Sequence, residues 1–126
     1  MRDGRCSALQ RTMCKGKIHR ATVTRADLEY EGSISLDAAL MAAADILPGE
    51  LVQITSLANG KRWRTYAMPA AAGMVGLNGP AARWFHPGDR VVVLSWGQYA
   101  PEELDRRRMR VVFVDQANRV ERVEER

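Results

Sequence analysis

The sequence predicts a mainly β protein of one domain, built from short strands and a few short helices. Runs rich in β-branched residues recur along the chain, bounded by Gly, Pro, Asn or Asp residues that favour turns. Only the stretch after Asp37 has apolar residues at helical spacing. The length of 126 residues allows one hydrophobic core and little more. Pattern alone does not separate a small β-barrel from an α+β sandwich.

The composition is that of an ordinary globular protein, with 46% apolar and 27% charged residues. The longest apolar run, Ala38 to Ala44, is too short to span a bilayer, and the N-terminus lacks the pattern of a secretion signal. Cys6 and Cys14 have neither redox nor zinc spacing, which suits a reducing compartment. We therefore expect a cytoplasmic protein with no membrane contact and no metal site.

The net charge of +4 and the pI near 9.5 permit binding of anions, nucleic acid included. However, basic residues alternate with acidic ones in PEELDRRRMR and RVERVEER, and no basic stripe is interleaved with aromatic residues. We therefore expect no nucleic-acid partner. A small acidic substrate would suit the same charge, although charge alone does not select it.

The N-terminal half alternates extended and helical patterns. Residues 1–10 are polar and without period, which predicts a disordered extension. Residues 16–24 are rich in β-branched residues and predict a strand. The residues that share one face of that strand in a regular alternation are Lys17, His19, Ala21 and Val23. Asp37 is a favourable N-cap for a helix that ends at Pro48, with Leu40, Met41, Ala44 and Leu47 at helical spacing.

The C-terminal half predicts further strands. Residues 51–57 and 61–68 read as a hairpin around the tight turn Asn59-Gly60, followed by a loop over 69–73. The remaining expected elements are a strand at 74–77, a turn or short helix at 79–84, a buried strand in RVVVLSW, helical turns at 101–108, a last strand at 109–115 and a flexible charged tail at 119–126.

The pair Gly32-Ser33 lies where an extended segment changes to an alanine-rich one, and alone it would indicate only a turn. Together with its surroundings it resembles the self-processing site of the aspartate 1-decarboxylases, the pyruvoyl enzymes that form β-alanine. The segments that carry the resemblance, in order from about Arg11 to Asp115, are RTMCKGKIHRATVTRADLEYEGS, SISLDAALMAAADILPGE, NGKRWRTYAM, GLNGPAARW, HPGDRVVVLSW and RVVFVD.

The resemblance implies a fold and an assembly. The fold would be a small six-stranded double-psi β-barrel with a few short helices, over residues 11–118. The assembly would be a homotetramer with its sites at subunit interfaces. The reaction would be decarboxylation of L-aspartate to β-alanine and CO2, which feeds pantothenate biosynthesis.

The resemblance also implies how the cofactor forms. The Ser33 hydroxyl would attack the Gly32 carbonyl, which an unusual glycine conformation would help, and convert the amide into an ester. β-Elimination would then divide the chain into a β chain, 1–32, and an α chain, 33–126, with Ser33 becoming a pyruvoyl group. That ketone would form a Schiff base with the substrate, so no external cofactor is required.

Tyr66 is expected to donate a proton to the carbanion, because a phenol keeps its proton at neutral pH; without the resemblance it would read as a half-buried strand residue. Thr65 is expected to act near the Gly32 carbonyl and later near the substrate, and Asn78 to assist cleavage. In a regular strand, however, Thr65 and Tyr66 face opposite ways. A bulge, a strand end or a neighbouring subunit must therefore intervene.

Arg62 would bind the substrate α-carboxylate with its guanidinium fork, and Lys17 the other carboxylate; otherwise both are solvated surface cations. The resemblance places backbone groups of Gly79, Pro80 and Ala81 at the substrate. His19 would assist proton transfer during cleavage, although a lone histidine on a strand is more often structural. Pro80, Arg83 in place of the customary histidine, and the shortened loop at 69–73 depart from the family pattern and affect the pocket rim. The alternatives are an uncleaved basic β-barrel binding module and a purely structural oligomerisation domain.

Overall fold

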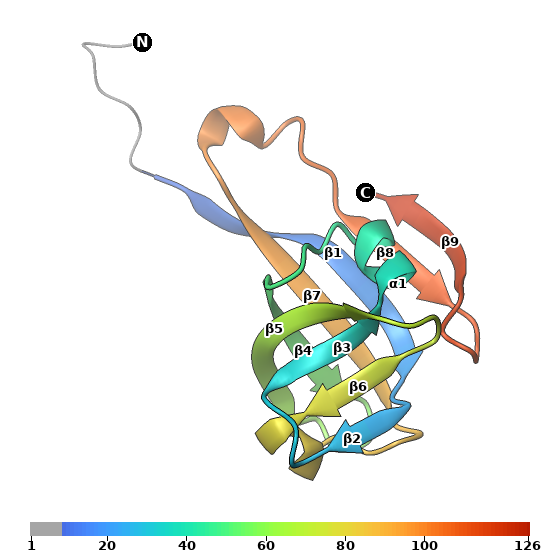
Figure 1. The fold of residues 1–126 in the computed structure, drawn as a ribbon. Helices are drawn as coiled ribbons and strands as arrows, with labels where there is room; N and C mark the ends of the chain where they lie inside the picture. Colours follow the sequence, from blue (N-terminus) through green and yellow to red (C-terminus); the bar gives the residue numbers. More distant parts are fainter. Residues whose placement is uncertain (1–8) are drawn as a thin grey trace.

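The computed structural model describes residues 9–126 and confirms a mainly β chain with a few short helices (Figure 1). In chain order the elements are β1 (Arg11–Thr22), β2 (Arg25–Asp27), β3 (Ser33–Asp37), α1 (Ala38–Ala43), β4 (Leu51–Ser56), β5 (Arg62–Ala70), β6 (Val75–Asn78), η1 (Gly79–Arg83), β7 (Arg90–Tyr99), η2 (Pro101–Glu103), β8 (Arg110–Val114) and β9 (Val120–Glu125). The expected disorder of residues 1–10 falls, for 1–8, outside the described residues.

Over residues 9–126 there are nine strands, which is more than the six of the expected barrel alone. They form one hydrogen-bonded series in the order β2-β6-β3-β5-β4-β7-β1-β8-β9. The series combines antiparallel pairs with three parallel ones, β1 with β8, β2 with β6 and β3 with β5. The double-psi barrel stays a prediction.

Strand β3 is the strand on which the site depends. It pairs parallel with β5, beginning at Ile34 opposite Ala67, and antiparallel with β6, where Ser33 is opposite Asn78. Ser33 is therefore the first residue of a strand that has neighbours on both sides, and backbone pairing fixes its position relative to β5 and β6.

Strand β1 contains a bulge that changes which side chains are buried. Arg20 has φ of 62°, and the pairing of β1 with β7 shifts between Ile18 and Ala21. The extra residue reverses the alternation, so Ile18 and Ala21 are both fully buried. The expectation that Lys17 and His19 share a face with Ala21 is therefore wrong.

Helix α1 begins as expected and ends early. Asp37 Oδ1 accepts a hydrogen bond of 2.7 Å from the Ala39 backbone N–H, and its Oδ2 accepts one of 2.8 Å from the N–H of Gly73. One carboxylate thus caps the helix and holds the loop that precedes β6. The helix stops at Ala43 rather than at Pro48, because Asp45 adopts a left-handed φ of 59°.

The hairpin of β4 and β5 is confirmed around the turn at Asn59-Gly60, and the three strands expected after it match β6, β7 and β8. Strand β5 continues two residues further than expected, to Ala70, into the segment that we expected to be a loop. Of the segment 101–108, only Pro101–Glu103 is helical.

The expectation of a flexible tail at 119–126 is wrong, because Val120–Glu125 forms β9, paired antiparallel with β8. The turn before β9 is held by Asn118, which is 1% exposed. Its side chain accepts a hydrogen bond from the Thr22 N–H at 2.8 Å and donates to the carbonyls of Thr22 and Gly73 at 2.9 and 3.0 Å. These bonds tie the C-terminal hairpin to β1 and to the loop before β6.

The core lies on one face of the strand series, with α1 closing it near β3 and β8 (Figure 1). Its largest fully buried side chains include Ile18, Ile34, Leu36, Leu40, Ile54, Leu77 and Phe85. None of the helices described within 9–126 is long and apolar enough to cross a membrane.

Candidate active site at the start of β3

Gly32 and Ser33 lie where the chain enters β3. A turn held by Asp27 precedes them, since Asp27 Oδ1 accepts a hydrogen bond from the Glu29 N–H at 3.1 Å. Gly32 is in a bend outside the strand, whereas Ser33 is its first residue and is only 3% exposed. The bond between them therefore joins a loop to a fixed strand end, with the serine hydroxyl shielded from solvent.

Asn78 binds the Ser33 hydroxyl. Its Nδ2 donates hydrogen bonds to Ser33 Oγ at 3.0 Å and to Ser35 Oγ at 2.9 Å, and the asparagine is 1% exposed. The Oδ1 atom of Asn78 is buried without a hydrogen-bond partner among the described residues. A buried acceptor without a hydrogen-bond partner is unusual in a folded protein. Ser35 was missed in the sequence, although it lies two residues after Ser33 on the same strand face.

Gly79 packs directly against the glycine of the Gly-Ser pair. It has φ of 70°, and a Cβ at this position would lie 3.0 Å from Gly32 Cα and 3.1 Å from Gly32 N. Gly32 itself does not have a positive φ. The unusual glycine conformation that we expected at Gly32 is therefore found at Gly79, which requires glycine both for its backbone and for its contact.

Tyr66 lies level with Ser33 across the β3–β5 pair. The hydrogen-bonded register of β3 and β5 begins with Ile34 opposite Ala67, so Ser33 and Tyr66 are the residues immediately before that pair. In-register residues of parallel strands point to the same face. Tyr66 is 42% exposed on the face opposite to the core, where it pairs with Leu51 of β4.

Thr65 lies level with Gly32 when the same register is continued by one residue. It faces away from Tyr66, and β5 carries no bulge there, because the β4–β5 register runs without a shift from Thr65 opposite Val52 to Tyr66. Thr65 and Tyr66 can nevertheless serve the same site, because the site lies at the end of β3. Since β3 begins at Ser33, Gly32 lies beyond the strand and is not confined to either face.

Arg62 and Lys17 lie on the same outer face as Tyr66, at a distance from Ser33 within one chain. Successive register partners across β5, β4, β7 and β1 form one row on this face, namely Arg64, Gln53, Leu94 and Lys17. At a strand spacing of about 4.8 Å, Lys17 is about 14 Å from Arg64, and four residues of β5 separate Arg62 from Tyr66 by about 13 Å. No hydrogen bond or ion pair within residues 9–126 joins either cation to Ser33.

His19 lies elsewhere, at the boundary of β1 and β8. Its ring contacts Phe113 edge-on, with centroids 5.5 Å apart. Burial lowers the pKa of His19 below its ordinary value of 6.5, and the neighbouring cations Lys17 and Arg20 lower it further. Among residues 9–126, no hydrogen bond or ring contact connects this imidazole with Ser33.

The segment Gly79-Pro80-Ala81 forms the first turn of η1. Pro80 is exposed and occupies the helix start, where a missing N–H is tolerated. Ala81 is fully buried, and its carbonyl accepts a hydrogen bond of 2.9 Å from the Trp84 N–H. Arg83 is exposed at the end of the turn. The proline therefore leaves the turn intact and changes only its solvent side.

Over residues 9–126, no group of three His, Cys, Asp or Glu side chains is placed to hold a metal ion. The site consists of a hydroxyl, an amide and a phenol at the meeting point of β3, β5 and β6. Such groups can position a nucleophile and transfer a proton, but they offer no electron acceptor.

Comparison with known proteins gives this arrangement a context. The family model for aspartate decarboxylase matches residues 9–121. The chain is also similar to aspartate 1-decarboxylase 1 of Gloeobacter violaceus (strain ATCC 29082 / PCC 7421), with 58% identity over 112 residues, which cover 87% of this chain and 95% of the relative. Both matches place the chain among the decarboxylases, a class of lyases. It belongs to the aspartate decarboxylase family.

Proposed function

We propose that the chain cleaves itself between Gly32 and Ser33 and uses the pyruvoyl group formed from Ser33 to convert L-aspartate into β-alanine. Family membership assigns the reaction class, decarboxylation of aspartate, and does not favour a binding module. The observation that carries the self-cleavage is the buried Ser33 hydroxyl held by Asn78 at 3.0 Å.

The cleavage step follows from the positions of these groups. Ser33 Oγ attacks the carbonyl carbon of Gly32, the C–N bond breaks, and an ester forms while the amine of Ser33 is released. Asn78 holds the oxygen, and Thr65, level with Gly32, is positioned to bind the carbonyl oxygen as charge develops on it. Loss of the Ser33 Cα proton then expels the Gly32 carboxylate from Cβ, and water replaces the amine nitrogen, which leaves as ammonia.

The residues around Ser33 fit the small group that results. A pyruvoyl group at the start of β3 would be held between Asn78 of β6 and Tyr66 of β5, with Gly79 leaving room beside it. The group supplies an electrophilic ketone that takes up the electrons released when CO2 leaves. Tyr66, half-exposed and level with Ser33, is positioned to give the proton that replaces the carboxyl group.

Substrate binding by Arg62 and Lys17 requires a second protomer. Both cations lie on the outer face at about 13 Å or more from Tyr66, too far to hold one small amino acid at Ser33 of the same chain. That face also leaves Met68 40% exposed. Such a surface fits contact with another copy. We therefore assign the enzyme to a homotetramer with sites between subunits.

A cytoplasmic location fits the free thiol of Cys14, which a reducing compartment preserves. Backbone groups of Gly79, Pro80 and Ala81 line the approach to Ser33 in this proposal, since η1 begins directly after Asn78. His19 is left with an accessory role, because its ring lies edge-on against Phe113.

Intact-mass analysis under denaturing conditions tests the proposal. The expected result is two fragments divided between Gly32 and Ser33, with the second carrying a ketone in place of the serine amine. Ser33→Ala should give one folded chain without decarboxylase activity. An active preparation that consists only of unbroken chain with an intact serine would contradict the proposal.

A further inference from the structure

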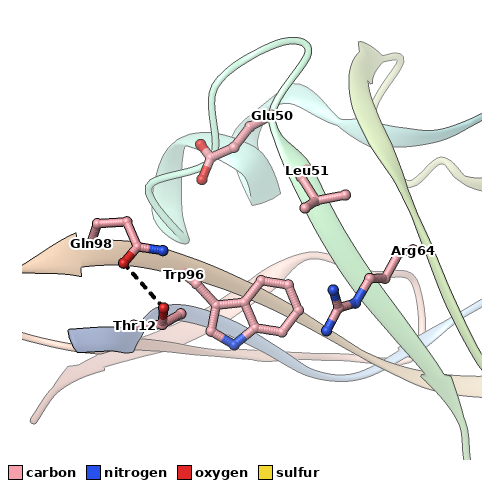
Figure 2. A pocket seen from close by; sticks show the side chains of 6 residues that line it. All are labelled: Thr12, Glu50, Leu51, Arg64, Trp96 and Gln98. Atoms are coloured by element: carbon pink, nitrogen blue, oxygen red, sulfur yellow. Dashed lines mark hydrogen bonds between the residues drawn. The ribbon is translucent and has the colours of Figure 1, made fainter. Parts of the chain in front are cut away.

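A pocket lies on the outer face of β1, β4, β5 and β7 (Figure 2). It has a volume of about 460 Å³ and is lined by Thr12, Glu50, Leu51, Arg64, Trp96 and Gln98. This volume falls within the range of about 300–1,000 Å³ that is typical of small-molecule sites. None of its residues belongs to the Ser33 site described above.

Arg64 is the charged group of the pocket that has no anionic partner. Within residues 9–126 it forms no ion pair, and its guanidinium carbon lies over the Trp96 ring, 5.4 Å from the ring centroid. Figure 2 shows the indole between the side chains of Thr12 and Arg64. Stacking on an aromatic face holds the guanidinium while its N–H donors stay available.

The carboxylate of the pocket does not compete for Arg64. Glu50 Oε2 forms an ion pair with Lys15 at 2.8 Å, and its Oε1 accepts a hydrogen bond from the Leu47 N–H at 3.0 Å. The polar rim is likewise satisfied, since the Thr12 hydroxyl donates to Gln98 Oε1 at 3.1 Å. Arg64 is thus left as a free, preorganised fork beside apolar surface from Trp96 and Leu51.

We propose that this pocket binds a small aliphatic carboxylate, with its carboxyl group on Arg64 and its carbon chain against Trp96 and Leu51. Guanidinium matches a carboxylate with two parallel hydrogen bonds. Leu51 is the register partner of Tyr66, so the pocket adjoins the tyrosine on the outer face. The carboxylate has two possible sources: the amino-acid substrate, held before it reaches a pyruvoyl site, or a separate small carboxylate.

Binding is tested in the Ser33→Ala variant with succinate, which has two carboxylates and no amine. The probe is the indole N–H signal of Trp96 in NMR spectra, with those of Trp63 and Trp84 as references. Succinate is expected to shift the Trp96 signal saturably. Arg64→Gln should weaken that binding by at least about tenfold, the usual effect of losing a charged hydrogen bond.

Arg122→Gln is the matched control. Arg122 also stacks on an aromatic ring, with its guanidinium 3.8 Å from the centroid of Phe113, but it lies on β9 outside the pocket. Its loss removes the same charge and should leave succinate binding unchanged. The proposal fails if succinate leaves the Trp96 signal unmoved, or if Arg64→Gln binds succinate as tightly as the parent variant.

Kinetics of the processed protein distinguish the two sources, and only this arm rests on the proposed function. If the pocket holds substrate, Arg64→Gln raises KM for aspartate with little change in kcat, and succinate competes with aspartate. If it holds a separate carboxylate, succinate changes kcat without competing. The binding arm uses an uncleaved chain, so it stays informative even if self-cleavage is disproved.

Discussion

The side-chain amide of Asn78 lies 3.0 Å from the hydroxyl oxygen of Ser33, and both residues are at most 3% exposed. A buried hydrogen bond of this kind selects one rotamer of the serine. The same amide donates to Ser35 at 2.9 Å, so the two serines and the asparagine form one unit across β3 and β6.

Asn78→Ala should slow self-cleavage by about tenfold or more, because the attacking oxygen loses the donor that positions it. The measurement is the fraction of unbroken chain over time on a denaturing gel. Ser35→Ala is the control, since it removes the second acceptor and leaves the Ser33 contact in place. Equal cleavage of Asn78→Ala and wild type would exclude a role for the amide.

Gly79→Ala should block cleavage through the backbone contact with Gly32. A Cβ there would lie 3.0 Å from Gly32 Cα, and φ of 70° adds strain of about 1 kcal/mol or more. Gly49→Ala is matched in strain, with φ of 83°, but meets no atom within 4 Å. Both variants should lose thermal stability, whereas only Gly79→Ala should accumulate precursor. Similar processing in the two would refute the contact.

Tyr66→Phe should leave processing intact and lower kcat by about 10²-fold or more, because the phenol oxygen is lost while the ring keeps its position beside Leu51. Mass analysis reports the processing, and β-alanine formation reports turnover. Tyr99→Phe, at the far end of β7, should affect neither. Loss of cleavage in Tyr66→Phe would show that the tyrosine acts earlier than we propose.

Local signals in the sequence predicted the elements that local chemistry determines. Asp37 caps α1 as expected, and Asn59-Gly60 joins β4 to β5. The resemblance also identified Ser33 and Asn78, which the structure brings into hydrogen-bond contact. The structure or role of each of these residues depends either on neighbours close in the sequence or on a motif specific to the family.

The features that could not be predicted from the sequence depend on pairing between strands that are distant in the chain. Strand β9 has charges on both faces, so its alternation is hidden, although Asp115 and Asn118 form a recognisable turn before it. The bulge at Arg20 reverses the buried face of β1, which a regular alternation cannot reveal. The part that Ser35 takes in the site depends on the register of β3 with β6 and has no local signature.

The stability of the fold should rise with pH through the range in which His19 titrates. The folded pKa of His19 is lowered by burial and then by Lys17 and Arg20, whereas the unfolded chain titrates near 6.5. Between these two pKa values the unfolded state binds more protons than the folded state. The free energy of unfolding therefore increases with pH in this range, and the contribution of His19 to it is lost as pH falls. His19→Gln should reduce the difference in urea midpoint between about pH 5.5 and about pH 7.5.

An NMR titration of the His19 ring checks the cause of this effect separately. The midpoint should lie below 6.5 in the folded protein, and a midpoint at or above that value would contradict the prediction. Added salt screens the charges of Lys17 and Arg20 but does not change burial, so it should raise the midpoint only part of the way. Since burial is the largest single cause, part of the depression of the pKa should persist at high salt.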